Sequence, residues 1–289
     1  MSVVIAATEV RALRERTGAG MMECKRALEE SAGNVESAIE WLRKQGMAKA
    51  AKKATRTAKE GQISTWSAPD GSAVVLVEVH CETDFVVKTE EFQRFAKEVT
   101  ELAGTKGLSD PAALLAQSIN GTTVEQWQTE LTAKIGENIG VSRVVRRAGT
   151  TPTHKVAQYI HAGSKIGVLV SFNDPANQLT PTIAKDVAMH VAAMNPQFVR
   201  RDQISADVIA REQDIARAQL ADQKKPPEII EKILVGRIAK FYSEVCLLEQ
   251  IFVKDPQGKQ TIAQAIKAVG DQIEVLDAIR VQVGTNEDR

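Results

Sequence analysis

The chain has 289 residues, of which 43% are hydrophobic, so it is long enough for two or three domains with real cores. It carries 37 basic and 37 acidic residues, and this balance excludes a global field that would attract nucleic acid. Its three cysteines, Cys24, Cys81 and Cys246, are far apart without metal-site spacing, which argues against disulfides and indicates a reducing compartment. No basic residue precedes the apolar run of residues 1–10, and no apolar segment approaches the roughly 20 residues of a membrane span. We therefore expect a soluble, cytoplasmic protein without a signal peptide or a membrane partner.

The first fifty residues predict three short helices. The first stops at Gly18-Ala19-Gly20, the second runs from about Met21 to Ala32, and Asn34 caps a third that ends before Gly46. Met21 and Met22 occupy adjacent positions of the second helix, so both cannot face inward easily, and we expect one of them in the core. Three helices of this size resemble a ubiquitin-associated domain.

The segment that follows these helices is basic. Residues 43–59 contain seven basic residues without an acid, namely Arg43, Lys44, Lys49, Lys52, Lys53, Arg56 and Lys59. Because alanines separate them, they predict a linker helix with a positive surface. RNA binding is one interpretation, but no aromatic side chains accompany the charges to stack on bases, which favours a solvated connector.

The middle of the chain repeats one pattern of hairpin, loop and helix. We expect paired strands followed by a helix twice, at 62–66 and 73–79 and again at 156–160 and 166–172. The second helix has Thr180 and Pro181 at its start. Residues 138–147, with alternating valines, add a strand to the first copy. We infer two α+β subdomains, each a small antiparallel sheet covered by helices.

Residues 205–241 predict an antiparallel helical hairpin, because apolar residues at helical spacing lie on either side of Lys224-Lys225-Pro226-Pro227. A short helix at 261–269 and a closing strand at 279–283 follow. The expected fold class is α+β, with an N-terminal three-helix module, two repeated subdomains with antiparallel sheets, and an inserted helical hairpin. The predicted domains are 1–55 (module and linker helix), 56–148 (first subdomain), 149–200 with 242–289 (second subdomain), and 201–241 (hairpin).

The stretch His80-Cys81-Glu82-Thr83-Asp84-Phe85-Val86 directly follows an apolar, β-branched strand at 73–79, which we expect to be covered on both faces. Since the next helical pattern begins at about Glu90, residues 83–88 are predicted to be a loop. An acid beside a phenylalanine in a loop suits insertion into a partner, with Phe85 filling a slot and Asp84 bringing a charge. The alternative is that Phe85 folds back onto the core and Asp84 caps the next helix.

Other reactive side chains favour structural roles. The sequence has no glycine loop that would cradle phosphates, so we expect no nucleotide bound by the chain itself, and no cofactor or metal. Cys81 with its neighbours could suggest a nucleophile or a metal site, but strand geometry points His80 and Cys81 to opposite faces and favours a buried thiol. His190 is predicted to be a core histidine. His161 lies at an exposed hairpin turn, where it serves either the turn itself or a second contact.

Several motifs resemble the elongation factor Ts family and follow that family's order from about residue 8 to residue 283. They are Arg14-Glu15-Arg16-Thr17-Gly18-Ala19-Gly20-Met21-Met22 with Cys24-Lys25 and Ala27-Leu28, Thr83-Asp84-Phe85-Val86, Lys134-Ile135-Gly136-Glu137-Asn138-Ile139, Tyr159-Ile160-His161-Ala162-Gly163, Ile166-Gly167-Val168-Leu169-Val170, and Met189-His190-Val191-Ala192-Ala193.

The resemblance implies a guanine nucleotide exchange factor of protein biosynthesis, not an enzyme, whose partner is the translational GTPase elongation factor Tu. It implies that the tip formed by Thr83, Asp84, Phe85 and Val86 enters the GTPase near its Mg²⁺. Phe85 would wedge helices apart there, and Asp84 would compete for groups organised around the ion and the phosphates.

The resemblance also implies secondary contacts by His161 and by Arg14, Met21 and Met22, with the hairpin contributing at the periphery. The turn after His161 reads Ala162-Gly163-Ser164-Lys165, where many relatives have more glycine and an arginine. Two other classes of protein stay open: a binding or RNA adaptor that acts through residues 1–60, and an enzyme that uses Cys81.

Overall fold

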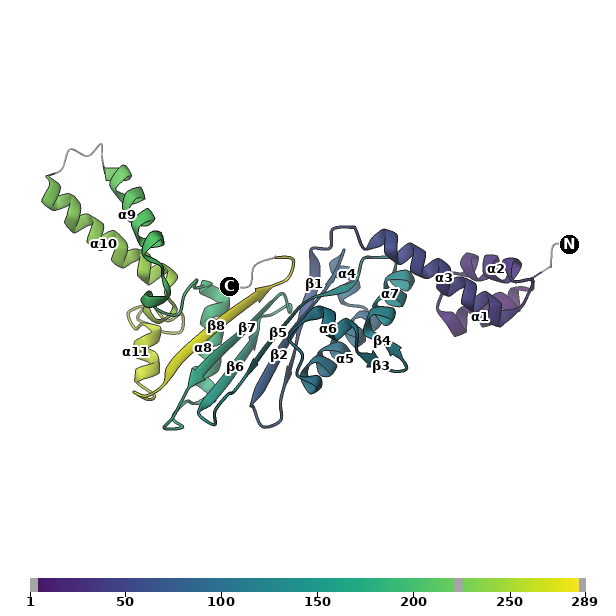
Figure 1. Cartoon of the computed structure of the whole chain (residues 1–289), viewed down its shortest axis with the longest axis horizontal. Coiled ribbons are helices and arrows are strands. Elements are labelled where there is room, and N and C mark those ends of the chain that lie inside the picture. Colours follow the sequence, from purple (N-terminus) through teal and green to yellow (C-terminus); the bar gives the residue numbers. More distant parts are fainter. Residues whose placement is uncertain (1–4, 221–225, 286–289) are drawn as a thin grey trace. The chain divides into compact units, whose positions relative to one another are not determined.

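The computed structural model describes residues 5–220 and 226–285, and it combines helices with small sheets (Figure 1). Its contacts divide the chain into two compact units. The first unit comprises Met1–Thr65 with Leu76–Val145, and the second comprises Trp66–Val75 with Arg146–Arg289. The α+β class expected from the sequence is confirmed, while the predicted domain boundaries and the internal repeat stay predictions.

Three N-terminal helices share a small core. They are α1 (Ala7–Thr17), α2 (Met21–Glu30) and α3 (Val35–Lys53). Gly18 ends α1 with a left-handed φ of 68°, and the side chain of Asn34 accepts a hydrogen bond from the Ser37 amide (2.9 Å), as a capping residue does. The core consists of apolar side chains from all three helices: Val10, Leu13, Cys24, Ala27, Leu28 and Ala38.

The prediction that the third helix ends before Gly46 is wrong, because α3 continues through this residue to Lys53. A glycine inside a helix costs only about 1 kcal/mol relative to alanine, and the alanines and lysines that follow are strong helix formers. The third helix and the predicted basic linker are therefore one helix. The likeness of the three helices to a ubiquitin-associated domain stays a prediction.

One three-stranded sheet has the order β1 (Glu60–Ser67), β2 (Ala73–Cys81) and β5 (Gly140–Ala148). The central strand β2 is buried along its whole length except at His80, which is half-buried. This confirms the prediction of a strand covered on both faces, and β5 confirms the strand predicted near residues 138–147.

The helices of the first unit beyond α3 are α4 (Asp84–Val87), α5 (Glu90–Lys106), α6 (Pro111–Leu115) and α7 (Val124–Ile135), with a small antiparallel pair β3 (Ser118–Ile119) and β4 (Thr122–Thr123). The sequence predicts Phe92, Phe95, Ala96, Val99 and Leu102 on one face of α5. The first four are buried at helical spacing together with Ala103, whereas Leu102 is only half-buried. The Phe95 ring meets Trp127 of α7 edge-on, with their centroids 4.9 Å apart.

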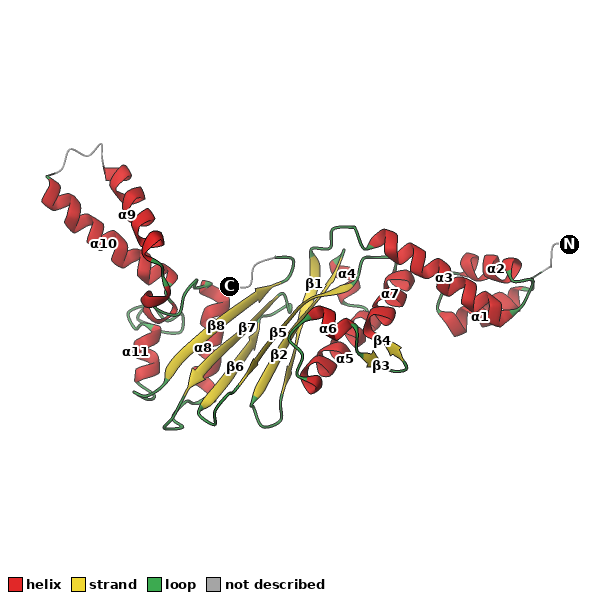
Figure 2. Ribbon diagram, in the orientation of Figure 1, coloured by secondary structure: helices red, strands yellow, loops and turns green. Residues whose placement is uncertain are grey.

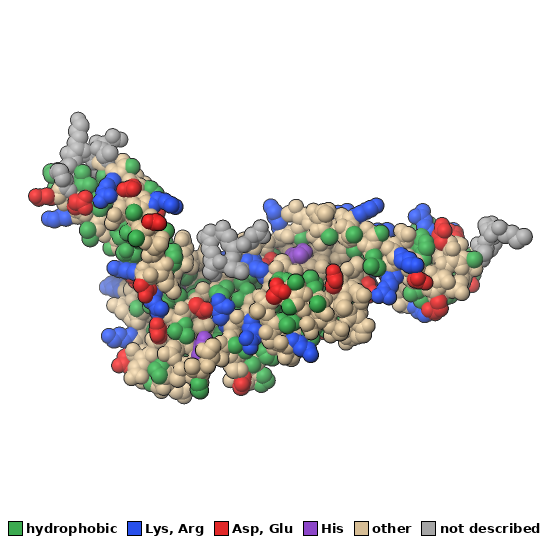
Figure 3. Space-filling view, viewed as in Figure 1, with side chains coloured by type: hydrophobic (Ala, Val, Ile, Leu, Met, Phe, Trp, Pro, Cys, Tyr) green, Lys and Arg blue, Asp and Glu red, His purple; other side chains and the backbone are tan. Residues whose placement is uncertain are grey.

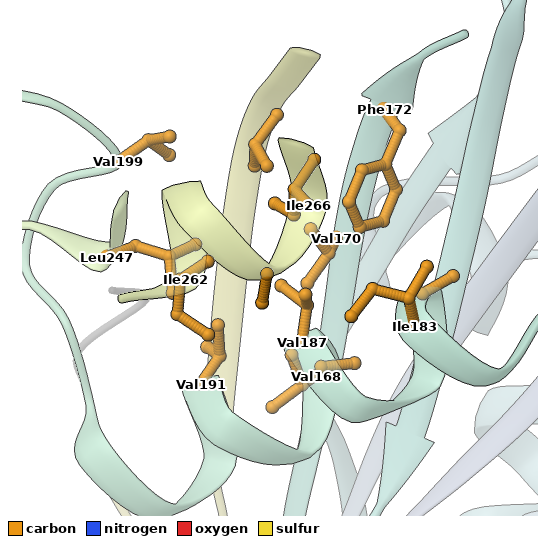
Figure 4. Close-up of a cluster of buried hydrophobic side chains, with 14 of the residues drawn as sticks. Val168, Val170, Phe172, Ile183, Val187, Val191, Val199, Leu247, Ile262 and Ile266 are labelled. Atoms are coloured by element: carbon orange, nitrogen blue, oxygen red, sulfur yellow. The ribbon is translucent and has the colours of Figure 1, made fainter. Parts of the chain in front are cut away.

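A second sheet is antiparallel throughout and has the order β6 (His154–Ile160), β7 (Ile166–Asn173) and β8 (Glu274–Gln282). Val168 of the central strand pairs with Tyr159 on one side and Arg280 on the other. Helix α8 (Pro181–Met194), capped by Thr180 as predicted, and α11 (Ile262–Lys267) pack apolar side chains against β7 (Figure 4). The closing strand is longer than predicted and begins at Glu274.

An antiparallel pair of helices, α9 (Ala206–Leu220) and α10 (Pro227–Val245), is inserted between the short 3₁₀ helices η1 (Arg201–Gln203) and η3 (Leu247–Glu249) (Figure 2). Ala216 and Leu220 pack against Leu234, Ile230 and Ile233 across the pair. The predicted turn at Lys224-Lys225 lies outside the described residues. On the face seen in Figure 3, basic and acidic side chains are interspersed over this hairpin.

The base of the hairpin has its own apolar cluster. Ile204, Val245 and Cys246 are buried there, and Phe198, Val208, Ile209, Phe241 and Tyr242 pack against them. Helix α10 thus extends beyond residue 241, where the sequence predicted its end, because Val245 belongs to this cluster.

Among the described residues, no helix combines the length and the apolar character needed to cross a membrane.

Replacing residues 211–239 by a glycine-serine bridge of roughly six residues should leave a folded protein. The stripes of the outer hairpin satisfy each other, whereas the base cluster lies outside the deleted segment. We expect a cooperative thermal transition close to that of the parent and monodisperse behaviour in gel filtration. Aggregation would instead show that the stripes of the outer hairpin belong to the main core.

His190 is a core histidine, as predicted. It is fully buried on α8, and its Nδ1 accepts a hydrogen bond from the Val253 amide (3.3 Å). Nε2 therefore carries the proton and donates to Gln250 Oε1 (2.9 Å). Burial lowers the pKa of His190 below its ordinary value, against a smaller opposing effect of the Gln250 hydrogen bond.

This lowered pKa predicts a loss of stability in acid. The unfolded chain takes up the His190 proton first as the pH falls, so the stabilisation is complete above about pH 6.5 and decreases below it. The urea midpoint of the parent should fall more between about pH 7.5 and about pH 5.5 than that of His190→Gln, which has no such proton to gain. Equal decreases in the two proteins would contradict the assignment.

Candidate functional site

The segment after β2 forms a single helical turn, α4, instead of the predicted loop. The Lys88 amide donates to the Phe85 carbonyl (3.2 Å), and the Thr89 amide donates to the Val86 carbonyl (3.0 Å). Four residues leave no periodic pattern in a sequence, and so short a helix is unstable in isolation. The turn therefore depends on contacts from elsewhere in the first unit.

The side chains of this turn differ in their exposure to solvent. Phe85 is 76% exposed, whereas the next residue, Val86, is only 7% exposed. The alternative in which Phe85 folds back onto the core is therefore wrong. Asp84 does not cap the next helix either, because Thr89 does so by accepting a hydrogen bond from the Phe92 amide (3.4 Å). Val86 anchors the turn, and Asp84 and Phe85 are presented to solvent.

Single exposed hydrophobic side chains are common on protein surfaces, so exposure alone does not define a site. Phe85 differs because it stands on a turn whose two ends are fixed, at Thr83 by hydrogen bonds and at Val86 by burial. A rigid aromatic side chain loses little conformational entropy when a partner covers it. Such groups are typical anchors of protein interfaces.

The charge of the turn is weakly held. The carboxylate of Asp84 lies 3.7 Å from Lys88 Nζ, and that ammonium lies 6.0 Å from the centroid of the Phe85 ring. Both charged side chains are exposed, and exposed ion pairs contribute little to stability. A partner can therefore take over Asp84 from Lys88 at small cost.

Thr83, the first residue of the predicted tip, is not exposed in the same way. Its amide and its hydroxyl both donate to the carboxylate of Glu137, a residue that the sequence did not single out as part of a site. The signal that pointed towards Glu137 was its place in the family motif at residues 134–139.

Cys81 is completely buried, and its thiol donates to the Thr83 carbonyl (3.1 Å). This confirms the buried structural thiol, and the enzyme alternative loses its nucleophile because no solvent or substrate reaches the sulfur. Cys24 and Cys246 are also free and buried, and burial raises the pKa of the Cys246 thiol to about 11. Within the described ranges, no group of three or more His, Cys, Asp or Glu side chains is arranged to hold a metal ion.

The residues predicted to make secondary contacts include three on the N-terminal helices. Arg14 is exposed on α1, and Met21 and Met22 are 40% and 74% exposed at the start of α2. The expectation that one of these methionines lies in the core is wrong. The inward positions of α2 are filled by Cys24, Ala27 and Leu28, which leaves both methionines outside.

A groove of about 790 Å³ adjoins Met22 within the first unit. Trp41 and Met47 line it from α3, and Trp127 and Lys134 line it from α7. The sequence could not predict this groove, because it exists only where α3 packs against α7.

Four of the seven basic residues at 43–59 form ion pairs. Arg43 lies 3.8 Å from Glu130, Lys44 lies 2.8 Å from Glu40, and Arg56 lies 3.5 Å from Glu82. Lys49 pairs with Glu23. A stripe whose charges are partly neutralised is a poorer backbone-binding surface for RNA, which weakens the RNA adaptor alternative.

His161 is exposed at the turn between β6 and β7 in the second unit, as predicted. Its amide donates to the Ile166 carbonyl (2.9 Å), and the turn passes through positive φ at Gly163 (85°) and Ser164 (56°). Its ring Nδ1 lies 3.1 Å from the hydroxyl of Tyr159. The side chain is thus displayed by a tight turn and steadied by an aromatic neighbour.

Comparisons with known proteins agree with the motifs. The family model for elongation factor TS matches residues 82–285. The elongation factor Ts of Nautilia profundicola is 45% identical over 290 residues, covering 97% of this chain and 93% of the relative. That of Clostridioides difficile is 44% identical, covering 97% and 93%, and that of Halorhodospira halophila is 44% identical, covering 99% and 94%.

These matches extend over nearly the full length at an identity well above the level at which families are ambiguous, and they confirm the resemblance drawn from the motifs. The chain therefore belongs to the elongation factor Ts family, whose members act in translation elongation as nucleotide exchange factors for elongation factor Tu.

Proposed function

We propose that this chain releases GDP from elongation factor Tu by inserting the Asp84–Phe85 turn into the GTPase beside its Mg²⁺ and phosphate site. The observation that carries the proposal is the exposure of Phe85 at 76% on a turn that Val86 anchors at 7%. A large apolar side chain presented in this way gains free energy only when a partner covers it. Fully burying a phenylalanine contributes about 1.5–3 kcal/mol.

The task of an exchange factor is defined by thermodynamic linkage. The factor speeds GDP release when it binds the nucleotide-free GTPase more tightly than the GDP-loaded form. By linkage, bound GDP lowers the affinity of the GTPase for the factor by the same ratio. It cannot select GTP over GDP, because it has no differential contact with a nucleotide that it does not touch. The chain thus acts by binding, without nucleotide, metal or cofactor of its own, in the cytoplasm where translation elongation takes place.

The two side chains of the turn have complementary roles. In GTPases, GDP is held by backbone and lysine contacts to its phosphates and by Mg²⁺ that bridges phosphate and protein. Phe85 wedges apart the elements that carry these groups. Asp84, a carboxylate held only by an exposed lysine, competes with the phosphates for the cationic groups and the ion.

Other surfaces of the chain are assigned to docking. The N-terminal helices, a module of the ubiquitin-associated type, bind the GTPase through Arg14, Met21 and Met22. His161 provides a second contact from the second unit, and the α9–α10 hairpin adds a peripheral one. Methionines suit such a surface because their flexible side chains adapt to the partner.

Replacing both Asp84 and Phe85 by alanine should slow catalysed GDP release without unfolding the protein. Losing an aromatic interface anchor costs roughly 2 kcal/mol or more, which is over tenfold in rate if the contact forms during release. The measurement is the release of fluorescent GDP from elongation factor Tu in Mg²⁺ at increasing factor concentration. Circular dichroism and the thermal midpoint report on the fold.

A double variant that exchanges nucleotide like its parent would remove the wedge assignment. The control is Ile251→Ala, because Ile251 is an exposed apolar side chain of the second unit to which no contact with the GTPase is assigned. It should leave the maximal release rate unchanged.

Replacing Met21 and Met22 by alanine should weaken the binding of the factor to the GTPase more than it slows GDP release within the complex. The half-saturating factor concentration should rise several-fold, about 1 kcal/mol, while the maximal rate is recovered at saturation. Point variants are preferable to deletion of residues 1–55, since that deletion would also remove the part of α3 that packs on α7. Met194→Ala, an exposed methionine of α8, is the control, and unchanged half-saturation in the double variant would exclude the docking role.

A further inference from the structure

The turn between α7 and β5, residues 136–138, belongs to a motif that the proposed function leaves unused. Gly136 ends α7 with a left-handed φ of 92°, which a residue with a side chain adopts only at a cost. The chain therefore reverses sharply, and the next two residues, Glu137 and Asn138, meet the end of β2 just before α4.

Glu137 accepts three hydrogen bonds from the two residues that precede α4. Its Oε2 accepts from the amides of Glu82 (3.1 Å) and Thr83 (2.9 Å), and its Oε1 accepts from the Thr83 hydroxyl (2.7 Å). Hydrogen bonds to a carboxylate are roughly twice as strong as those between neutral groups. One side chain thus fixes both the backbone and the side chain at the base of the turn.

The contact is reciprocal. The amide of Asn138 donates to Glu82 Oε1 (2.7 Å), and the same carboxylate oxygen lies 3.5 Å from the Arg56 guanidinium. The side-chain amide of Asn138 donates to the carbonyls of Arg56 (2.8 Å) and Ala54 (3.4 Å), just beyond the end of α3. These part-buried bonds hold the turn at 136–138 between the base of α4 and the chain that leaves α3.

We propose that Glu137 is a positioning residue for nucleotide exchange, which fixes the base of α4 so that Asp84 and Phe85 enter the partner in one orientation. This inference rests on the proposed function of the turn. A four-residue helix does not hold its own direction, and Val86 alone anchors it at one point. Glu137 supplies the second point, at Thr83, the residue directly before α4.

The second point of attachment restricts the direction of α4 already in the free protein, before it binds the partner. Without it, the base of α4 samples several directions, and only the fraction in the competent one can insert. Docking through the N-terminal helices is separate from this step. The loss of Glu137 should therefore lower the maximal rate of GDP release and leave the half-saturating factor concentration nearly unchanged.

The test compares Glu137→Ala and Glu137→Gln with the parent in fluorescent GDP release from elongation factor Tu. We expect the alanine variant to release GDP about tenfold more slowly at saturation, with half-saturation within about twofold of the parent. The glutamine variant should recover much of this loss. Its side-chain carbonyl can accept hydrogen bonds from the two amides, and its NH₂ can donate one to the Thr83 hydroxyl, although the carboxylate charge is absent. Glu125→Gln, at an exposed position of α7, is the matched control and should behave like the parent.

Two further readouts separate positioning from general stability. Hydrogen exchange of the Glu82 and Thr83 amides should quicken about tenfold in Glu137→Ala, while the amides of β2 keep their protection. In a Phe85→Ala background, Glu137→Ala should cause little further slowing, because both changes act through the same insertion step.

The outcomes of this test are distinct. If Asp84→Ala/Phe85→Ala itself exchanges like the parent, the proposed function fails, and the positioning role fails with it. If that double variant is slow but Glu137→Ala reaches the parental maximal rate, the positioning role is overturned and the function of the turn stands. Equal slowing by Glu137→Ala with and without Phe85, or no recovery in Glu137→Gln, also overturns it, since both results indicate a structural role only.

Discussion

A helical turn of four residues cannot stabilise itself, and this constraint governs the first unit. The fully buried strand β2 fixes the point at which α4 emerges, and Val86 pins the turn to the body. Hydrogen bonds to Glu137 of the α7–β5 turn hold the two residues that precede α4. Each of these supports costs conformational entropy that the turn by itself could not offset, so the surrounding core supplies the free energy.

The fold leaves several large apolar side chains exposed. Phe85 and Met22 gain nothing from the hydrophobic effect in the free chain, because neither is covered. The cores of the first unit are filled by other residues, such as Phe92 and Phe95 on α5 and Cys24 and Leu28 between the N-terminal helices. Stability is therefore provided by one set of side chains, and the other set keeps its burial free energy available for a partner.

The second unit follows the same principle with different parts. Its central strand β7 is buried on both faces, and α8 and α11 close the core over it. The neutral, fully bonded His190 shows how a polar side chain is accommodated in that core without a charge. His161 is displayed at a strand end, where backbone hydrogen bonds close a tight turn and leave the ring outside.

The sequence by itself determined the features that depend on local chemistry. The apolar runs at β2 and β7, the amphipathic face of α5, and the caps at Asn34 and Thr180 were all readable, because neighbouring residues alone decide them. The motifs at residues 14–22 and 83–86 also pointed to the family. The sequence singled out Asp84 and Phe85 as candidates for a contact site for the same reason, since they interrupt the pattern between a strand and a helix.

Only the tertiary structure decided the features that depend on residues far apart in the chain. Glu137 meets Thr83 across more than fifty residues, directly before the helical turn α4. The continuation of α3 past Gly46, the exposure of both methionines and the cluster at the base of the hairpin likewise follow from packing. Periodicity reports which residues prefer to be buried, but it does not say which partner buries them, and that choice is made by contacts that form only when the chain is folded.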